Sequence, residues 1–223
     1  WILAAAFLLQ ACSKDEEEGP YVPWRPGDDK EETIDLDKAT KVMILTEQAK
    51  NRIVMIDQPT GKVAWEWTAA DSGLSAAEQA WFDLPDEAKP VYNRTCVLVT
   101  ASGGGVALIR IADKKAMFYA KPGGNPHSAE VLPDGNVVVA SSTGNLLSVY
   151  VYNGADSYVS RPAFTMPVHS AHNVVWDRKR GCLWTATGAQ LLKLAYNGKR
   201  TDPELTQVRS CLLYTSPSPR DCS

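Results

Sequence analysis

The segment Cys96-Val-Leu-Val-Thr-Ala-Ser-Gly-Gly-Gly-Val-Ala-Leu-Ile-Arg-Ile111 joins two short apolar runs through a glycine-rich turn. Apolar and β-branched runs on both sides of such a turn predict a β-hairpin. The pattern recurs in Val42–Asp57, Asn136–Tyr150 and Cys182–Leu194. The four segments start 54, 40 and 46 residues apart, close to the blade period of a propeller. The sequence therefore predicts an all-β fold built from β-propeller blades.

Turn residues and one helical segment complete this interpretation. Pro133-Asp-Gly-Asn136 and Asn197-Gly198 supply residues that tight hairpins favour. Ser75 to Phe82 is the one stretch with a helical pattern, with Ser75 as N-cap, and we place it between two blades. Of Trp65 and Trp67, we expect one to pack between blades and the other to be exposed. Four blades are recognisable, and we expect six or seven in the intact protein.

The N-terminal sequence resembles a lipoprotein signal. Residues 1–11 form an apolar run, too short to span a bilayer, that stops at Cys12 after a small residue. We expect residues 1–11 to be an incomplete signal peptide and Cys12 to be lipidated. Residues 12–32 are acidic and rich in proline and glycine, which predicts a disordered tether. A lysine followed by acidic residues after the lipidated cysteine resembles the signal for the outer face of the outer membrane, although a plain solvated linker has the same composition.

The C-terminal residues 211–223 resemble a translated sequencing adapter, so we expect the biological sequence to stop near Ser210 and the partial propeller to occupy residues 33–210. Of the remaining cysteines, Cys96 and Cys182 lack the spacing of a metal site. We expect both to be buried as small apolar residues and not joined by a disulfide. The formal net charge of −3 gives no basic surface for nucleic acid, which we exclude as a partner.

Two histidines occupy equivalent places in the repeats. His127 precedes the third repeat and His172 precedes the fourth. Each falls at the start of the strand expected to be innermost, where side chains reach the axial channel of a propeller. An imidazole there suits a metal ligand, a general base or a hydrogen-bond partner for a sugar or carboxylate. The alternative is that each histidine only caps a turn, repeated because the blades are duplicates.

Other polar residues are weaker candidates for the same site. His169 lies in the loop before His172, Ser102 lies in a close-approach glycine loop, and Lys89 and Arg110 offer positive charge for an anionic ligand. Glu130 is a third candidate catalytic residue beside the two histidines, although a carboxylate at its position can simply accept from a backbone amide.

The stretches Gly61–Trp67, Thr100–Arg110 and Asn125–Asn136 are similar to those of a Bacteroidota propeller lipoprotein family of unknown function, over roughly residues 37–198. The His-x-x-x-x-Leu-Pro-Asp-Gly-Asn element, which starts at His127, also resembles arylsulfotransferase-type propellers. That second resemblance implies catalysis by histidines at the channel, and it is an analogy at the level of the fold.

Two functions remain open from the sequence. In the first, a surface-exposed outer-membrane lipoprotein, held at the membrane by its lipid anchor, binds a glycan, another small molecule or a partner protein at its channel. In the second, the propeller is a lyase, esterase or sulfotransferase-like enzyme, with His127 and His172 as general base or as ligands of a divalent metal. A metal site predicts further His, Asp or Glu ligands at the same repeat position in other blades.

Overall fold

The computed structural model describes residues 31–212, and these residues form an all-β fold. The strands are β1 (Val42–Glu47), β2 (Arg52–Asp57), β3 (Lys62–Trp67), β4 (Pro85–Val91), β5 (Cys96–Ala101), β6 (Val106–Arg110), β7 (Ala116–Ala120), β8 (Pro126–Val131), β9 (Val137–Ser141), β10 (Leu146–Tyr150), β11 (Phe164–Pro167), β12 (Asn173–Asp177), β13 (Cys182–Ala186), β14 (Gln190–Tyr196) and β15 (Leu205–Leu212). The helical elements are η1 (Leu36–Lys38), η2 (Gln48–Lys50), η3 (Ala69–Ser72), α1 (Ala76–Gln79) and η4 (Ala80–Phe82).

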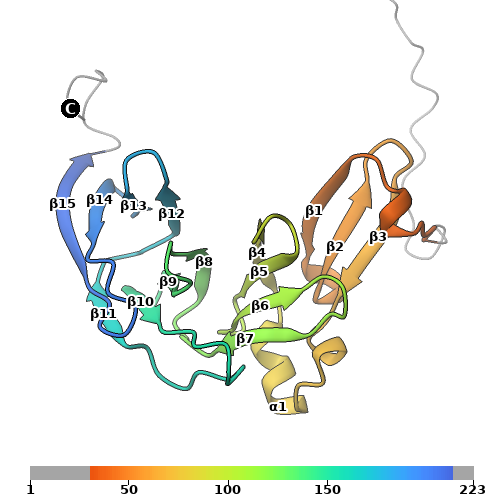
Figure 1. Ribbon diagram of the computed structural model, residues 1–223, viewed down its shortest axis with the longest axis horizontal. Coiled ribbons are helices and arrows are strands. Elements are labelled where there is room, and N and C mark those ends of the chain that lie inside the picture. Colours follow the sequence, from red (N-terminus) through yellow and green to blue (C-terminus); the bar gives the residue numbers. More distant parts are fainter. Residues whose placement is uncertain (1–30, 213–223) are drawn as a thin grey trace, which may run out of the picture. The chain divides into compact units, whose positions relative to one another are not determined.

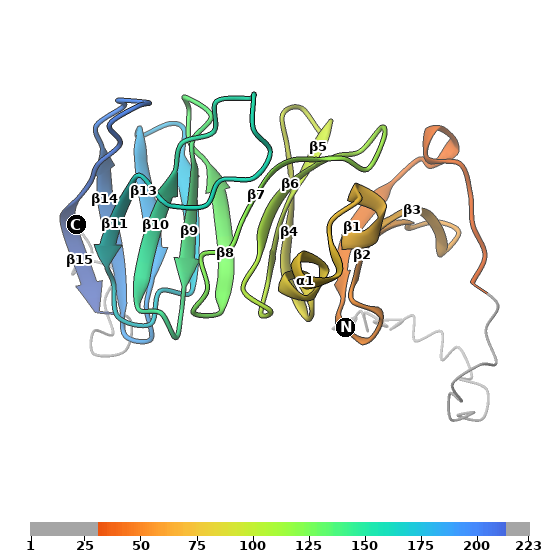
Figure 2. The same ribbon diagram turned by 90° about the horizontal axis from the view of Figure 1, so that it is seen from below.

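The strands form four antiparallel sheets that follow one another along the chain (Figures 1 and 2). Three sheets have four strands each, namely β4–β7, β8–β11 and β12–β15, and the first has three, β1–β3. Within each sheet, strands adjacent in sequence are adjacent in space. This is the arrangement of propeller blades, so the predicted fold class is confirmed.

The predicted hairpins correspond to strands β1–β2, β5–β6, β9–β10 and β13–β14. In the three complete sheets this hairpin supplies the second and third strands, after a first strand β4, β8 or β12. The longer first interval arises because η3, α1 and η4 are inserted between β3 and β4. Ser75 caps α1 and forms a reciprocal capping box with Glu78, as the sequence pattern predicts.

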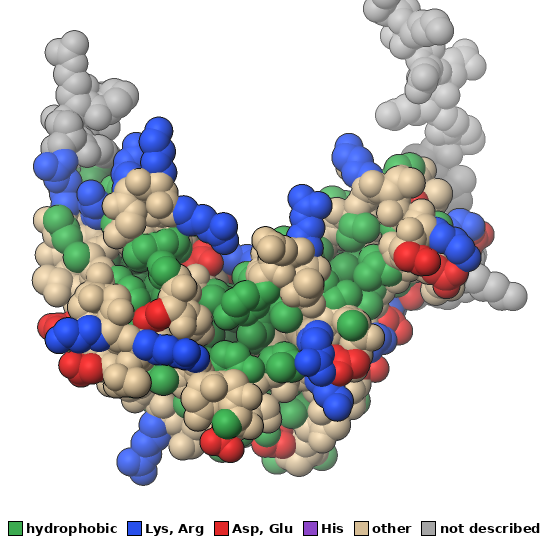
Figure 3. All heavy atoms as spheres, viewed as in Figure 1, with side chains coloured by type: hydrophobic (Ala, Val, Ile, Leu, Met, Phe, Trp, Pro, Cys, Tyr) green, Lys and Arg blue, Asp and Glu red, His purple; other side chains and the backbone are tan. Residues whose placement is uncertain are grey.

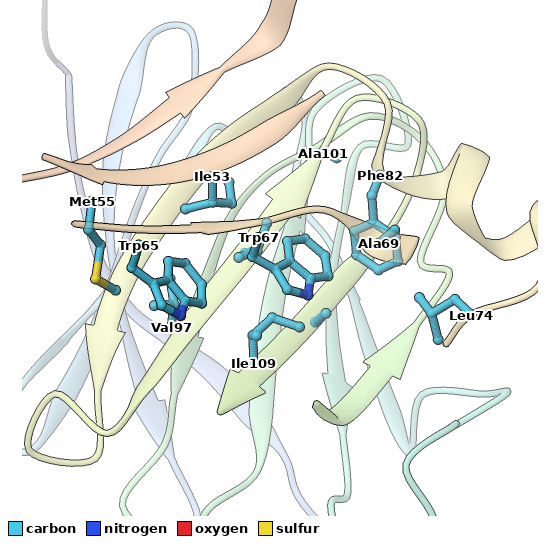
Figure 4. Packing of buried hydrophobic residues seen from close by; sticks show 12 residues of the cluster. Ile53, Met55, Trp65, Trp67, Ala69, Leu74, Phe82, Val97, Ala101 and Ile109 are labelled. Atoms are coloured by element: carbon cyan, nitrogen blue, oxygen red, sulfur yellow. The ribbon is translucent and has the colours of Figure 1, made fainter. Parts of the chain in front are cut away.

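The first two blades share a hydrophobic core (Figure 4). Both Trp65 and Trp67 are buried in it, so the expectation that one of them is exposed is wrong. Residues two positions apart on a strand face the same side of the sheet, and this side packs against the second blade. Trp65 Nε1 donates to Ile111 O at 3.0 Å, and the Trp67 ring meets Phe82 edge-on at 5.5 Å.

Two outer sheet edges are covered by short segments that run parallel to them. Thr33 pairs with Val63 on β3, and Tyr158 pairs with Tyr119 on β7. The second pairing includes hydrogen bonds from Tyr119 N to Ser157 O (2.7 Å) and from Val159 N to Tyr119 O (3.0 Å). Because an uncovered edge strand can pair with another chain, these segments protect the two blades from association.

Cys96 and Cys182 are buried and free, as expected. Strand β15 continues to Leu212, so the first two residues of the segment interpreted as an adapter pair with β14. The signal peptide, Cys12 and nearly all of the tether lie outside the described residues. Within residues 31–212, no helix has the length and hydrophobicity needed to cross a membrane.

Candidate functional site

Asp86, His127 and His172 occupy the same position at the start of three successive first strands. In each case the residue two positions earlier has a left-handed backbone: Leu84 (φ 53°), Asn125 (φ 57°) and Ser170 (φ 53°). Asp86 and His127 each form the extra residue of a β-bulge, and His172 immediately precedes β12. Bulges redirect a side chain relative to its strand and are frequent beside functional sites. The repeated backbone therefore presents three chemically active side chains in one row.

The three side chains of the Asp86–His127–His172 row are in contact. His127 Nδ1 lies 3.5 Å from Asp86 Oδ2. The rings of His127 and His172 stack with centroids 5.1 Å apart and planes inclined by 15°. His172 is exposed, and the side chains of His127 and Asp86 are 29% and 14% exposed, so the histidine end of the row is accessible from solvent.

Neighbouring residues hold the aspartate from two blades. Ser102 Oγ donates to Asp86 Oδ2 at 2.8 Å from the turn between β5 and β6. Gln48 Nε2 donates to Pro85 O at 3.3 Å and lies 3.5 Å from Asp86 Oδ1. Asp86 is thus fixed by its own blade and by the preceding one. Ser102, which we predict to bind a ligand, lies beside the row and supports Asp86.

Hydrogen bonds determine which nitrogen of each imidazole carries the proton. His172 Nδ1 lies 2.9 Å from Ser170 O, which can only accept, so Nδ1 donates and the neutral ring keeps a lone pair on Nε2. His127 Nε2 lies 3.1 Å from the amide nitrogen of Asn125, which donates to it. Nδ1 of His127 then carries the hydrogen that faces Asp86. The row therefore presents a carboxylate and a free imidazole lone pair, both of which accept hydrogen bonds.

Lys89 lies further along the first strands and does not offer a free charge. Its Nζ donates to Ser128 Oγ (3.2 Å), Ala129 O (3.0 Å) and Val174 O (2.9 Å), and it pairs with Glu87 at 3.1 Å. A lysine ammonium has three hydrogens, and these acceptors use all of them. Lys89 thus joins β4, β8 and β12, and its contact with a ligand stays a prediction.

Glu130 also joins first strands. Its Oε1 accepts from Val131 N at 3.1 Å and its Oε2 from Trp176 N at 3.4 Å. Glu87 and Ser128 accept in the same way from Ala129 N (3.0 Å) and Val174 N (3.1 Å) in the next blade. Side chains of one blade thereby satisfy backbone donors on the inner edge of the next. The alternative interpretation of Glu130, as an acceptor for backbone amides, matches these contacts better than a catalytic role.

The glycine loop after Ser102 is a close-approach loop, as expected. A Cβ on Gly103 would lie 2.5 Å from Ala80 O, and one on Gly105 would lie 2.8 Å from Trp81 O. Gly105 N donates to Trp81 O at 2.8 Å. The loop is thus held against the inserted η4 segment, which fixes the position of Ser102 beside Asp86.

Two predicted site residues lie apart from the row. Arg110 pairs with Cys96 at the far end of β5, whereas the row lies beside Ala101 at its other end, and Arg110 forms an ion pair with Asp113 at 2.5 Å. That ion pair lowers the pKa of Asp113 to about 2. His169 is exposed and lines a pocket of about 430 Å³ with Thr187, Gln190 and Ser170, whose carbonyl accepts from His172. Within residues 31–212, no hydrogen bond, ion pair or ring contact joins Arg110 or His169 to a side chain of the row, so a role in binding at the row stays a prediction for both.

Within residues 31–212, no three His, Cys, Asp or Glu side chains are grouped as metal ligands would be. A divalent metal at His127 and His172 therefore stays a prediction that depends on additional ligands.

Asp86 and Gln48 are the residues that sequence reasoning missed. A signal for Asp86 was present, because Leu84-Pro-Asp86 and Asn125-Pro-His127 share a proline before the candidate residue. The register of the other repeats, aligned on that proline, would have placed Asp86 beside His127. Gln48 comes from a turn of the preceding blade and has no such signal.

Comparison with solved structures supports the class of fold. The chain superposes with a TM-score of 0.54 on Kuenenia stuttgartiensis hydrazine synthase, at 16% identity and covering 81% of this chain and 48% of that one. It matches a chain of a mitotic checkpoint complex with a TM-score of 0.57 at 11% identity, covering 76% and 48%. It matches Kluyvelomyces marxianus Hsv2 with a TM-score of 0.53 at 9% identity, covering 76% and 56%. The chain thus spans about half the length of these structures, and at such identities the likeness concerns the fold alone. No curated protein matches the sequence.

The fold and the repeated first strands define a β-propeller protein. A family model covers residues 2–219, and the chain belongs to that family, the family of unknown function DUF6528.

Proposed function

We propose that this protein is a lipid-anchored binding protein of the outer cell surface, whose propeller binds a glycan at the Asp86–His127–His172 row. The observation that carries the proposal is the equivalence of these residues: three successive blades present a polar side chain from one backbone position. If these residues only repeated a structural turn, their side chains would not need to contact one another from blade to blade, as His127 does with Asp86 and His172.

The chemistry of the row suits a ligand rich in hydroxyl groups. Asp86 and His172 Nε2 are acceptors, and sugar hydroxyls donate readily to both. Asp86 is already oriented by Ser102 and Gln48, so little freedom is lost when a ligand binds. The positive charge of Lys89 is used within the protein, which disfavours an anionic ligand and favours a neutral one.

Affinity electrophoresis through gels that contain starch, xylan, galactomannan or pectin tests this function. We expect retardation by at least one neutral polysaccharide, and a weakening of about tenfold or more in Asp86→Asn and His172→Ala, which each remove one hydrogen-bond acceptor. Asp156→Asn, an exposed aspartate in the loop between β10 and β11, is the matched control. Equal retardation of Asp86→Asn, His172→Ala and the control would refute binding at the row.

The surface location rests on the sequence of residues 1–32. We expect Cys12→Ser to move the protein from the membrane fraction to the soluble fraction, because the thiol is the site of acylation. Protease treatment of intact cells would digest the anchored protein if it faces outward. A protein that resists the protease until the cells are broken would face the periplasm instead.

A second function, catalysis, is favoured by one specific observation. The exposed His172 holds its proton on Nδ1 against Ser170 O, which leaves Nε2 ready to accept a proton as a general base. If the protein is an enzyme acting on the bound polysaccharide, His172→Gln should abolish the release of reducing ends while binding is retained. Unchanged turnover in this variant would exclude His172 as the base.

A further inference from the structure

The end of the blades opposite the Asp86–His127–His172 row carries exposed positive charge. Each first strand starts beside the row and turns into its second strand at the opposite end, as β4 does between Val91 and Cys96. Four exposed cations lie in these turns or just before β1, and within residues 31–212 their side chains form no ion pair or hydrogen bond: Lys41, Arg94, Arg178 and Lys179. We call these four residues and Tyr92 the basic edge.

The turns at the row end have a different character. The turns between the second and third strands of the three complete blades lie there, and residues 102–105, 142–145 and 187–189 include no Lys, Arg, Asp or Glu. The exposed cations of that end are engaged, since Lys50 pairs with Glu47 at 3.3 Å and Lys121 lies over the Trp81 ring at 5.2 Å. The two ends of the blades therefore present different chemistry, with uncharged turns around the row and basic turns opposite to it.

Contacts between neighbouring turns bring the residues of the basic edge together. Lys41 and Arg94 line the same cavity between the first two blades. Tyr92 lies in the turn of Arg94 and reaches the β8–β9 turn, where a Cβ on Gly135 would be 3.6 Å from its hydroxyl. β12 lies against β8, which places the remaining two cations beyond that turn. Figure 3 shows Lys and Arg side chains on the side of the sheets where the first strands lie.

The carboxylates beside the basic edge are held by the protein. Asp134 accepts from Tyr196 at 2.6 Å, and Asp177 pairs with Arg180 at 2.9 Å. Asp57, next to Lys41, is buried and accepts hydrogen bonds from its own turn. The positive charge of the basic edge is therefore left for a partner outside these turns.

The backbone of the turn after β4 gives a second, independent observation. Tyr92, Asn93 and Arg94 are three consecutive residues in the left-handed region, with φ of 49°, 53° and 66°. This conformation is unfavourable for residues with a Cβ, and such strain is concentrated at functional sites. Here it presents Tyr92, which is 44% exposed, beside a free arginine. Tyrosine and basic residues together are typical of surfaces that lie at lipid head groups.

We propose that the basic edge faces the anionic head groups of the membrane, so that the row points away from it. The inference rests on the proposed lipidation of Cys12. The chain joins the blades at the basic end, because Glu32 O accepts from Val63 N at 2.9 Å and Glu32 pairs with Lys62, the first residue after the β2–β3 turn. Each Lys or Arg near an anionic membrane surface strengthens binding. In this orientation the row is open to polysaccharides outside the cell.

Sedimentation with lipid vesicles tests this orientation. The protein is the full chain with Cys12→Ser, so that no acyl chain contributes to binding. We expect binding to vesicles of equal parts phosphatidylcholine and phosphatidylglycerol, little binding to phosphatidylcholine alone, and a loss of binding as salt is added. Arg94→Gln combined with Lys179→Gln should weaken the binding about tenfold or more. Lys50→Gln combined with Lys121→Gln removes the same charge at the row end and should weaken it less than about twofold.

Lysine acetylation followed by mass spectrometry reports the orientation without changes to the basic edge. On the Cys12→Ser chain bound to the mixed vesicles, Lys41 and Lys179 should react several times more slowly than in solution, because the head groups cover them. Lys121, at the row end, should react at the same rate in both states. This measurement keeps the test valid if the combined variants do not fold.

Three results would overturn the proposal. The first is binding to neutral vesicles that equals binding to the mixed vesicles, or no binding to either. The second is an equal effect of the two combined variants, or equal protection of Lys121 and Lys179. The third is release from the vesicles by free glycerol 3-phosphate, which would assign the basic edge to a soluble anion. None of these results depends on glycan binding or on acylation, so each would leave the proposed function of the row and the anchor to their own tests.

Discussion

The substitution Lys89→Met removes the ammonium that joins three blades and keeps most of the apolar stem. Nζ donates to Ser128 Oγ, Ala129 O and Val174 O at 2.9–3.2 Å and neutralises Glu87. Hydrogen bonds from a charged group contribute about 1.5–3 kcal/mol each. Because the side chain is 23% exposed, water replaces part of this contribution. At about 1 kcal/mol for each of the three bonds, we expect a loss of about 3 kcal/mol in the free energy of unfolding.

Urea unfolding followed by tryptophan fluorescence measures this loss. With a slope of about 2 kcal/mol per molar urea, the midpoint should fall by about 1.5 M. Lys179→Met, at an exposed lysine in the turn between β12 and β13, should shift the midpoint by less than about 0.3 M. If both variants shift equally little, the contacts of Lys89 do not hold the first strands together, and Lys89 returns to the candidates for ligand binding.

Three further predictions concern stability. Asp57 is buried and accepts hydrogen bonds from Thr60 Oγ, Thr40 N and Lys41 N, and these bonds lower its pKa. The ionised carboxylate therefore adds to the free energy of unfolding above the unfolded pKa of about 3.9, and this contribution is lost as the pH falls through the folded pKa. Asp57→Asn should therefore destabilise the protein at pH 7 and have little effect at pH 2–3 in urea titrations; an effect that is equal at both pH values contradicts this. Gly124 has φ +63°, and a Cβ in Gly124→Ala would lie 2.5 Å from the backbone of a facing loop. We expect thermal unfolding to show a loss of about 2 kcal/mol or more for Gly124→Ala and of about 1 kcal/mol for Gly154→Ala, whose Cβ meets nothing within 4 Å. Equal losses would refute the close approach. Tyr196 donates to Asp134 Oδ2 at 2.6 Å, and burial together with this bond raises the pKa of Tyr196 to about 12. The protonated hydroxyl therefore adds to the free energy of unfolding below the unfolded pKa of about 10, and this contribution is lost as the pH rises through about 12. Tyr196→Phe should lower the free energy of unfolding by about 1–2 kcal/mol at pH 7, and an unchanged melting temperature would show that the hydrogen bond to Asp134 does not stabilise the fold.

The blades could be predicted from sequence because their signal is local. Alternating apolar runs and turn residues such as Pro133–Asn136 fix the hairpins, and the capping box at Ser75 fixes the short helix. The first strands were harder to recognise. β4 contains two prolines and several charged residues, and its place beside β5 depends on contacts with the next blade.

The candidate site was predicted in part for the same reason. Repetition in the sequence identified His127 and His172, and the structure stacks their rings. Asp86 takes the same backbone position with a different side chain, so a search for repeated residue types passed over it. Lys89 was interpreted as a free charge because its three acceptors belong to β8 and β12, the most distant of them 85 residues away in sequence.

The segment around Tyr158 has a consequence for the order of folding. It follows β10 of the third blade, yet it pairs with β7 of the second. During synthesis, the second blade therefore keeps an open edge until about forty further residues have emerged after β7. The second blade is thus completed by a segment that follows β10 of the third blade, so these two blades should unfold together, and a cut between Tyr150 and Tyr158 would damage both.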